Sequence, residues 1–304
     1  MDAANHRRAI NSVSNGFFQG VAVVVETTQA NPASRRLLRQ RYEKRQRSKS
    51  IVIATLSTLL VLSLVVFLIR RSPGWPKVKA SFFDTEILVS TFPSLLKAFT
   101  LDVAIFLWSA PLIALLGLVI ALFRDQRKPA MFPLRVFGII YTDIFRGVPV
   151  ILIVFLIGFG IPGLGLPRPW NSPYIWGSLA LILTYSAYVA EIIRSGIESV
   201  HQSQRAAGKS LGLSDADTMR YVVLPQALRR VVPANMNMLV ALQKDVALLS
   251  FIGPVEILRQ AGVHKALLAN FTPYVGAALI FLAVTVPATR YADYLLARQQ
   301  RERS

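Results

Sequence analysis

Cysteine is absent from this sequence of 304 residues, and histidine occurs only three times. A chain without cysteine forms no disulfides, iron–sulfur clusters or thiolate metal sites. His6, His201 and His264 are scattered along the chain, without the spacing that metal ligands require. The residues also contain no nucleophile–base pair that would indicate a membrane enzyme. We therefore predict no metal site and no catalytic residue in this chain.

Charged residues are scarce as well, at 16% of the chain against 53% hydrophobic residues. Four stretches contain no charged residue at all: 51–69, 103–123, 169–190 and 266–289. Each matches the roughly 20 apolar residues that cross the hydrocarbon core of a bilayer. Two further stretches, about 136–161 and about 231–251, each contain only two charged residues. The sequence therefore predicts an all-α integral membrane protein with about six transmembrane helices, since a lone span must satisfy its own backbone hydrogen bonds.

A large soluble protein with buried helices is the alternative to a membrane protein. Four separate uncharged runs argue against it, because buried helices of soluble domains rarely need such length. A secretory signal is not visible, since the first apolar run begins at residue 51 and lacks a small-residue cleavage site.

Acidic residues number 16 against 34 Lys and Arg, which gives a formal net charge of +18. The basic residues concentrate in residues 35–49, directly before the first apolar run, where Glu43 is the one acid. The run lacks the interleaved aromatic residues that stack on nucleic-acid bases. Basic residues beside a span mark its cytoplasmic side and attract anionic lipid. We therefore expect membrane lipid and not nucleic acid as the partner, and, with six spans, both termini in the cytoplasm.

Composition divides the chain into segments of different character. These are a basic cytoplasmic tail without stable structure, a first transmembrane helix, an external loop, a core of five spans and a short basic tail: 1–50, 51–70, 71–90, 91–298 and 299–304. Within the core, residues 195–230 form a cytoplasmic loop. The external segments 72–76 and 161–170 are rich in Pro and Gly, which cannot continue a helix. No internal sequence repeat is visible.

The polar hairpin at residues 203–225, SQRAAGKSLGLSDADTMRYVVLP, is the most informative segment. Its first part is a short helix with three small residues, Ala206, Ala207 and Gly208, so another surface can approach it closely. Gly212 is expected to end this helix, because glycine readily takes the left-handed conformation of a helix C-terminus.

A second short helix is expected to follow in the same hairpin. Ser214 is suited to cap its N-terminus, and Asp215 and Asp217 fall in the first turn, where the helix dipole favours negative charge. Pro225 is expected to end it at Leu224, because the residue before a proline avoids the α region. The sequence thus predicts a compact pair of short helices, with an ordinary amphipathic helix on the membrane surface as the alternative.

Residues 203–210, SQRAAGKS, differ at one position from the phosphate-binding pattern G-x-x-x-x-G-K-[ST], since Ser203 replaces the first glycine. A phosphate loop requires a strand before it and a helix N-terminus after it. Here a helix precedes the GKS residues and Gly212 ends that helix soon afterwards. We therefore predict that this chain does not bind a nucleotide.

The hairpin resembles the cytoplasmic coupling loop of ABC-type importer permeases, whose pattern is E-A-A, three residues, Gly, nine residues, then I-x-L-P. Residues 206–208 occupy the E-A-A positions, Gly212 occupies the glycine, and residues 222–225 occupy I-x-L-P without a gap. Ala206 stands where the family has glutamate, and Ser203 where it usually has glycine.

Two further stretches are similar to the polar-amino-acid subfamily of these permeases. Residues 141–149, YTDIFRGVP, are similar to its Arg-Gly-Thr-Pro element, and residues 187–194, AYVAEIIR, to its A-Y-x-A-E-x-x-R element. Residues 224–227 and the pair Lys244-Asp245 also fit. The resemblance covers about residues 91–298.

The resemblance implies a permease subunit of an ATP-driven, binding-protein-dependent importer for polar amino acids in the bacterial plasma membrane. It implies a second permease subunit, an ABC ATPase dimer that holds ATP and Mg, and an extracytoplasmic binding protein. This chain would then bind no cofactor and would not itself be an enzyme. An ion-gradient-driven secondary amino-acid transporter is the alternative, although such carriers are generally longer and contain repeats.

The resemblance also implies roles for particular residues. The residues expected to dock on the ATPase are Gln204, Ala206, Ala207, Gly208, Leu211, Gly212, Leu213, Leu224 and Pro225. Candidates for the translocation pathway or for structural ion pairs are Asp143, Arg146, Gly147, Pro149, Tyr188, Glu191, Arg194, Lys244 and Asp245. Charges inside a membrane are costly and by default mark function. Spacing predicts that Asp143 pairs with Arg146 and Glu191 with Arg194, while contact with a substrate's amino or carboxylate group remains open.

Overall fold

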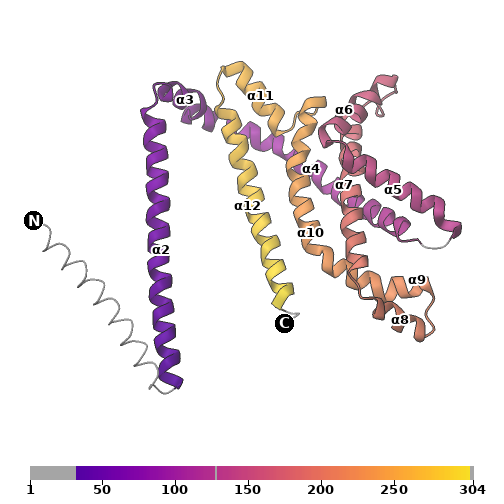
Figure 1. Ribbon diagram of the computed structural model, residues 1–304. Coiled ribbons are helices and arrows are strands. Elements are labelled where there is room, and N and C mark those ends of the chain that lie inside the picture. Colours follow the sequence, from indigo (N-terminus) through magenta and orange to yellow (C-terminus); the bar gives the residue numbers. More distant parts are fainter. Residues whose placement is uncertain (1–31, 127–128, 302–304) are drawn as a thin grey trace, which may run out of the picture. The chain divides into compact units, whose positions relative to one another are not determined.

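The computed structural model (Figure 1) describes residues 32–126 and 129–301, and every regular element in these ranges is a helix. The chain divides into two compact units, Met1–Trp75 and Pro76–Ser304. Most of the predicted N-terminal tail, residues 1–31, lies outside the described residues, as do residues 302–304 of the C-terminal tail.

In the described part of the first unit the chain forms helix α2, at Pro32–Arg71. Its apolar part, Ser50–Arg71, is long enough to cross a bilayer and buries none of its side chains within the protein. The sequence predicted a tail without structure as far as residue 50, but residues 32–50 continue the helix. Runs of Arg, Lys, Leu, Gln and Glu, all good helix formers, explain this extension.

The second unit begins with two helices where an external loop was expected at residues 71–90. These are α3 at Trp75–Phe82 and α4 at Thr85–Arg124. Asp84 caps α4 by accepting hydrogen bonds from the backbone N–H groups of Glu86 and Ile87, at 3.0 and 3.1 Å. Most of the predicted loop is therefore helical, and α4 begins well before the uncharged run at residue 103.

The stretch predicted as one span at about 136–161 is a bent pair of helices. The pair consists of helix α5 at Phe132–Gly147 and helix α6 at Val150–Gly160. The helix direction bends by 104° at the break between them. Val148 takes an extended conformation at the bend, as the residue before a proline prefers. A short 3-10 helix, Pro162–Leu164, then ends the pair in the Pro- and Gly-rich segment.

The remaining elements follow α7, which runs over Pro173–Glu198. They are α8 at Gln202–Ser210, α9 at Asp215–Asp217, the π-helix η3 at Thr218–Val223, α10 at Leu224–Asp245, the 3-10 helix η4 at Val246–Ile252, α11 at Ile257–Leu268 and α12 at Thr272–Arg301. The uncharged run at 266–289 is broken at Ala269, which takes a left-handed conformation with φ 48°. The last apolar helix is therefore Thr272–Leu295.

The described residues contain four helices that are long and apolar enough to cross a membrane, or up to six spans if each bent pair forms one. The single helices are Ser50–Arg71, Trp75–Arg124, Pro173–Glu198 and Thr272–Leu295. The second bent pair, Asp215–Ile252 with Ile257–Leu268, turns by 50°. The all-helical membrane fold predicted from the sequence is confirmed in this form.

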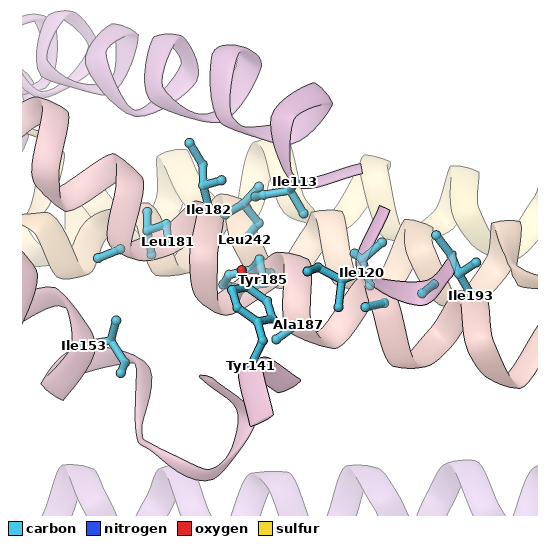
Figure 2. Close-up of a cluster of buried hydrophobic side chains, with 14 of the residues drawn as sticks. Ile113, Ile120, Tyr141, Ile153, Leu181, Ile182, Tyr185, Ala187, Ile193 and Leu242 are labelled. Atoms are coloured by element: carbon cyan, nitrogen blue, oxygen red, sulfur yellow. The ribbon is translucent and has the colours of Figure 1, made fainter. Parts of the chain in front are cut away.

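Helix α7 forms the centre of the second unit and is buried along most of its length. Figure 2 shows side chains from α4, α5 and α10 gathered around it, among them Ile113, Tyr141 and Leu242. Small residues allow this close packing, as is common between helices in membranes. A second cluster of buried side chains joins α4, α11 and α12: Leu95, Phe99, Ile257, Ala261, Ala277 and Ile280.

Candidate functional site

The first half of the hairpin is a short helix with defined ends. The imidazole of His201 caps α8 by accepting a hydrogen bond from the backbone N–H of Ser203 at 3.2 Å. At the other end Gly212 has φ 80°, its N–H donates to the carbonyl of Lys209, and the N–H of Leu213 donates to that of Gly208. This is the Schellman arrangement that closes a helix at a glycine. The predicted role of Gly212 as a helix stop is confirmed.

The second half begins at Ser214, as the sequence predicted. The hydroxyl oxygen of Ser214 accepts a hydrogen bond from the backbone N–H of Asp217 at 3.1 Å and donates to its carboxylate at 2.6 Å. Lys209 of α8 lies 2.8 Å from the carboxylate of Asp215, so an ion pair links the two short helices. Both partners are exposed, and such a pair adds at most about 1 kcal/mol.

Gly208 is the buried contact between the two halves. A Cβ at this position would lie 3.1 Å from the side chain of Thr218. The surface that approaches this glycine is therefore the π-helix of the same hairpin. Ala206 and Ala207, the other two small residues of α8, are exposed.

The chain does not break at Leu224, so the prediction of a helix end there was wrong. Residues 218–223 form a π-helix that runs directly into α10, and the N–H of Leu224 donates to the carbonyl of Met219. Pro225 falls in the first turn of α10, where a missing N–H costs little. Single π turns inside longer helices often mark functional sites.

Arg205 of α8 links the hairpin to two neighbouring helices. Its guanidinium lies 3.7 Å from the carboxylate of Asp125, at the end of α4, and donates to the carbonyl of Ile197 in α7 at 3.5 Å. Beside the hairpin, Arg230 of α10 donates hydrogen bonds to the carbonyl and the hydroxyl of Ser199, just after α7. A displacement of the hairpin would therefore act on α4, α7 and α10 together.

A cluster of charges gathers around Glu191 on the side of α7 that faces α4 and α5. One oxygen of the Glu191 carboxylate accepts a hydrogen bond from Arg124 at 2.5 Å and lies 3.2 Å from the guanidinium of Arg146. The other oxygen accepts from Arg194, which also pairs with Glu198. One carboxylate thus ties together α4, α5 and α7.

This cluster confirms one predicted pair and corrects another. Glu191 pairs with Arg194 as predicted. Arg146, however, forms its ion pair with Glu191 and not with Asp143. Its guanidinium also lies 6.0 Å from the centre of the Tyr188 ring. Within the described part of the chain Asp143 is exposed and forms no ion pair. A partly buried carboxylate shared by several arginines attracts a guanidinium more strongly than an exposed neighbour does.

A second polar link joins α7 to the end of α10. The hydroxyl of Tyr185 donates a hydrogen bond to the carboxylate of Asp245 at 2.8 Å. The neighbouring Lys244 is exposed, and among the described residues it has no acidic partner. Asp245 therefore has a structural partner inside the chain, whereas Lys244 is exposed.

Comparison with known proteins decides the family. The family described as "Binding-protein-dependent transport system inner membrane component" matches residues 113–301, which include the hairpin and the Glu191 cluster. The chain belongs to this family. It is a permease subunit of the bacterial inner membrane and crosses it several times. The resemblance predicted from the hairpin is thus confirmed.

Relatives of the permease match over most of their length. The probable glutamine ABC transporter permease protein GlnM of Bacillus subtilis is 32% identical over 61% of this chain and 84% of its own. The arginine transport system permease protein ArtQ of the same organism is 30% identical over 68% of this chain and 92% of its own. A crystal structure of an amino acid ABC transporter with histidines matches with TM-score 0.64 and 30% identity, over 71% of this chain and 98% of the other.

The predicted docking residues of the permease differ in their exposure to solvent. Those on its surface are Gln204, Ala206, Ala207, Leu211, Gly212 and Pro225. Leu213 and Leu224 are partly buried, and Gly208 is buried. Leu211 is the most prominent apolar group, with 82% of its surface exposed. Gly147 and Pro149, from the other predicted set, lie at the bend between α5 and α6 and are exposed.

Sequence reasoning missed several residues that build the site. Arg124 directly follows an uncharged run and is not among the predicted site residues, yet it binds Glu191. Arg205 and Tyr185 carried no recognisable pattern, although each makes a polar link between helices. Partners of this kind lie on different helices, so no local spacing could identify them.

Proposed function

We propose that this permease is the transmembrane subunit of an ATP-driven importer for polar amino acids. The observation that carries the proposal is the hairpin at residues 203–225. Its own caps define it, Arg205 links it to α4 and α7, and its π-helix continues into α10. Relatives named for glutamine and arginine transport support the substrate class.

In this proposal the permease works with separate subunits. An ABC ATPase dimer binds and hydrolyses ATP with Mg, and an extracytoplasmic binding protein delivers the amino acid. A second permease subunit, either another copy or a paralogue, completes the pathway. This chain contributes no catalytic residue and binds no cofactor.

We also propose six spans with both termini in the cytoplasm. The four single helices and the two bent pairs supply these spans. Within the second unit, α8 and α9 lie at the opposite end of α7 and α10 from α11 (Figure 1). Basic residues concentrate at the hairpin end, among them Arg205, Lys209, Arg220, Arg229 and Arg230. The excess of Lys and Arg supports a cytoplasmic location for this end.

The exposed surface of α8 and the turn after it would dock on the ATPase. The exposed residues there are Gln204, Ala206, Ala207 and Leu211. The buried Gly208 packs against Thr218 and so joins the two halves of the hairpin. Closure of the ATPase dimer would then move the hairpin as a unit and shift the spans between inward-open and outward-open states. ATP drives such a change only because the ATPase binds it more tightly in one of the two states.

Leu211→Asp provides the test, because it places a charge on the exposed surface without disturbing a buried contact. We expect loss of co-purification with the ATPase subunit and at least about a tenfold loss of ATP-dependent amino-acid uptake, since an apolar anchor in an interface contributes about 1–2 kcal/mol or more. Leu164→Asp is the matched control. Leu164 is 75% exposed and lies between α6 and α7, away from the hairpin.

Two results would contradict the proposal. Normal co-purification and uptake in Leu211→Asp would show that the hairpin does not dock through this surface. Uptake by the wild type that survives ATP depletion but collapses with an uncoupler would instead identify an ion-gradient-driven carrier.

A further inference from the structure

Two carboxyl groups are buried against each other where α4 meets the start of α11. Asp102 of α4 is 2% exposed, and Glu256, which precedes α11, is fully buried. Asp102 lies outside the segment matched by the family, which begins at residue 113. The Glu191 cluster and the hairpin do not involve either residue.

Both acids bind the N-terminus of α11. The two oxygens of Glu256 accept hydrogen bonds from the backbone N–H groups of Leu258 and Arg259, each at 2.8 Å. One oxygen of Asp102 accepts from the N–H of Ile257 at 3.1 Å. Three successive N–H groups of the first turn are thereby satisfied, and the dipole of α11 favours negative charge at this end.

The second oxygen of Asp102, Oδ1, has no hydrogen-bond donor among the described residues. Both carboxyl groups accept from the same first turn of α11, so the two acids lie next to each other. Two ionised carboxylates cannot hydrogen-bond to each other, because both only accept. Two adjacent buried negative charges would also be costly without a cation.

In the described part of the chain neither acid pairs with a cation. Arg259 is exposed, and its guanidinium donates to the carbonyl of Ser250 instead. The helix η4 and the first 18 residues of α12, 272–289, which also pack here, have no charged residue in their sequence. The neighbouring side chains include Phe99, Ile257 and Ala261, which are apolar and buried.

We propose that Asp102 and Glu256 form a proton-binding site that holds one proton between them. One of the two carboxyl groups is neutral and donates to the other, which stays ionised at the N-terminus of α11. Each oxygen of the pair then has a partner, and one negative charge remains where the helix dipole favours it. The proton links α4 to the bend between η4 and α11.

This link depends on pH. As the pH rises the shared proton is lost, and two negative charges then face each other in an apolar interior. A proton bound by the folded state and released on unfolding stabilises the fold at low pH, and this contribution disappears as the pH rises. The proposal does not rely on the transport function proposed above.

Other titratable groups near this interface must be separated from the pair. His264 on α11 lies 2.6 Å from the hydroxyl of Ser94 and 3.1 Å from the amide of Gln260. Lys97 of α4 is exposed, and Lys265 of α11 lies over the ring of Phe271. These groups are all retained in a variant altered only at Asp102, so a difference between its pH profile and that of the wild type isolates the pair.

Asp102→Asn is the test, because an asparagine amide can donate to Glu256 and its carbonyl can accept from Ile257, as the protonated acid does. Thermal unfolding of the full chain in detergent would be measured from about pH 5 to about pH 9. We expect the Tm of the wild type to fall relative to that of Asp102→Asn as the pH rises. Glu86→Gln, an exposed acid on the same helix, should keep the wild-type profile.

Infrared spectroscopy gives a second readout that does not depend on stability. The wild type should show the carbonyl stretch of a protonated carboxylic acid, which should be missing in Asp102→Asn and retained in Glu86→Gln. Parallel Tm profiles for wild type and Asp102→Asn, or an infrared band unchanged by the substitution, would overturn the proposal.

Discussion

At the scale of single residues, charge inside the second unit is organised around carboxylates. Glu191 is bound by Arg124, Arg146 and Arg194, and Asp245 by Tyr185. A carboxylate offers two oxygens with several lone pairs, so it can bind several donors from different helices at once. Each of these acids therefore links its own helix to at least one neighbour. Most of the groups that bind them come from different helices.

Glu191→Gln should destabilise the permease, because three arginines would lose their shared anion. We expect a loss of about 1–3 kcal/mol, the range for leaving charged groups unsatisfied. The measurement is thermal unfolding in detergent. Glu198→Gln is the control on the same helix. The Glu198 side chain is 60% exposed and pairs with Arg194, so a much smaller effect is expected. Equal effects of the two substitutions would show that the cluster does not matter for stability.

At the scale of elements, α7 holds the second unit together because its small residues let neighbouring helices approach. A Cβ at Gly117 of α4 would lie 2.6 Å from Val189 of α7, and one at Gly196 of α7 would lie 2.4 Å from Val231 of α10. Both distances are too short for real atoms. In a membrane the hydrophobic effect does little between helices, so such close contact is a main source of their association.

Gly196→Ala should force α7 and α10 apart at the base of the hairpin. The added methyl group would meet Val231 and also the backbone carbonyl of Ala227, at 3.1 Å. We expect a loss of about 1–3 kcal/mol in stability, as for other overpacked contacts. Gly160→Ala is the control, because a Cβ there would have no neighbour within 4 Å. Unfolding temperatures of the two variants should differ clearly; indistinguishable values would refute close packing at Gly196.

At the scale of the whole molecule, each of the two bent helix pairs carries an exposed charged residue within an apolar stretch. Asp143 lies on α5 and Lys244 near the end of α10, and both are exposed. A charge at membrane depth is costly against lipid and normally faces a partner or water. We therefore expect these faces to point toward the pathway or the second permease subunit proposed above.

The absence of native cysteine makes this expectation measurable, since one introduced cysteine reports on its own position. Lys244→Cys in the assembled transporter should react with a water-soluble maleimide, because thiolate formation requires an aqueous surrounding. Leu115→Cys on α4, 61% exposed in the single subunit, should remain unlabelled in lipid. A Lys244→Cys variant as inert as Leu115→Cys would place that residue away from water.

The sequence by itself determined the features that depend on neighbouring residues. Apolar length predicted membrane helices, Gly212 predicted the end of α8, and Ser214 predicted the cap of α9, because each signal acts within one turn of chain. Pattern matching at the hairpin also identified the family. Local signals failed at Pro225, where the π-helix runs directly into α10, and at residues 71–90, which contain α3 and the start of α4.

Only the tertiary structure decided which groups meet. Arg146 binds Glu191 and not Asp143, Arg124 joins the same carboxylate, and Asp102 meets Glu256, which lies more than 150 residues away in the sequence. The energy of a buried charge depends on every helix packed around it, and that packing is set by contacts such as Gly196 with Val231. Spacing along one helix therefore cannot reveal these partners, whereas the arrangement of helices fixes them.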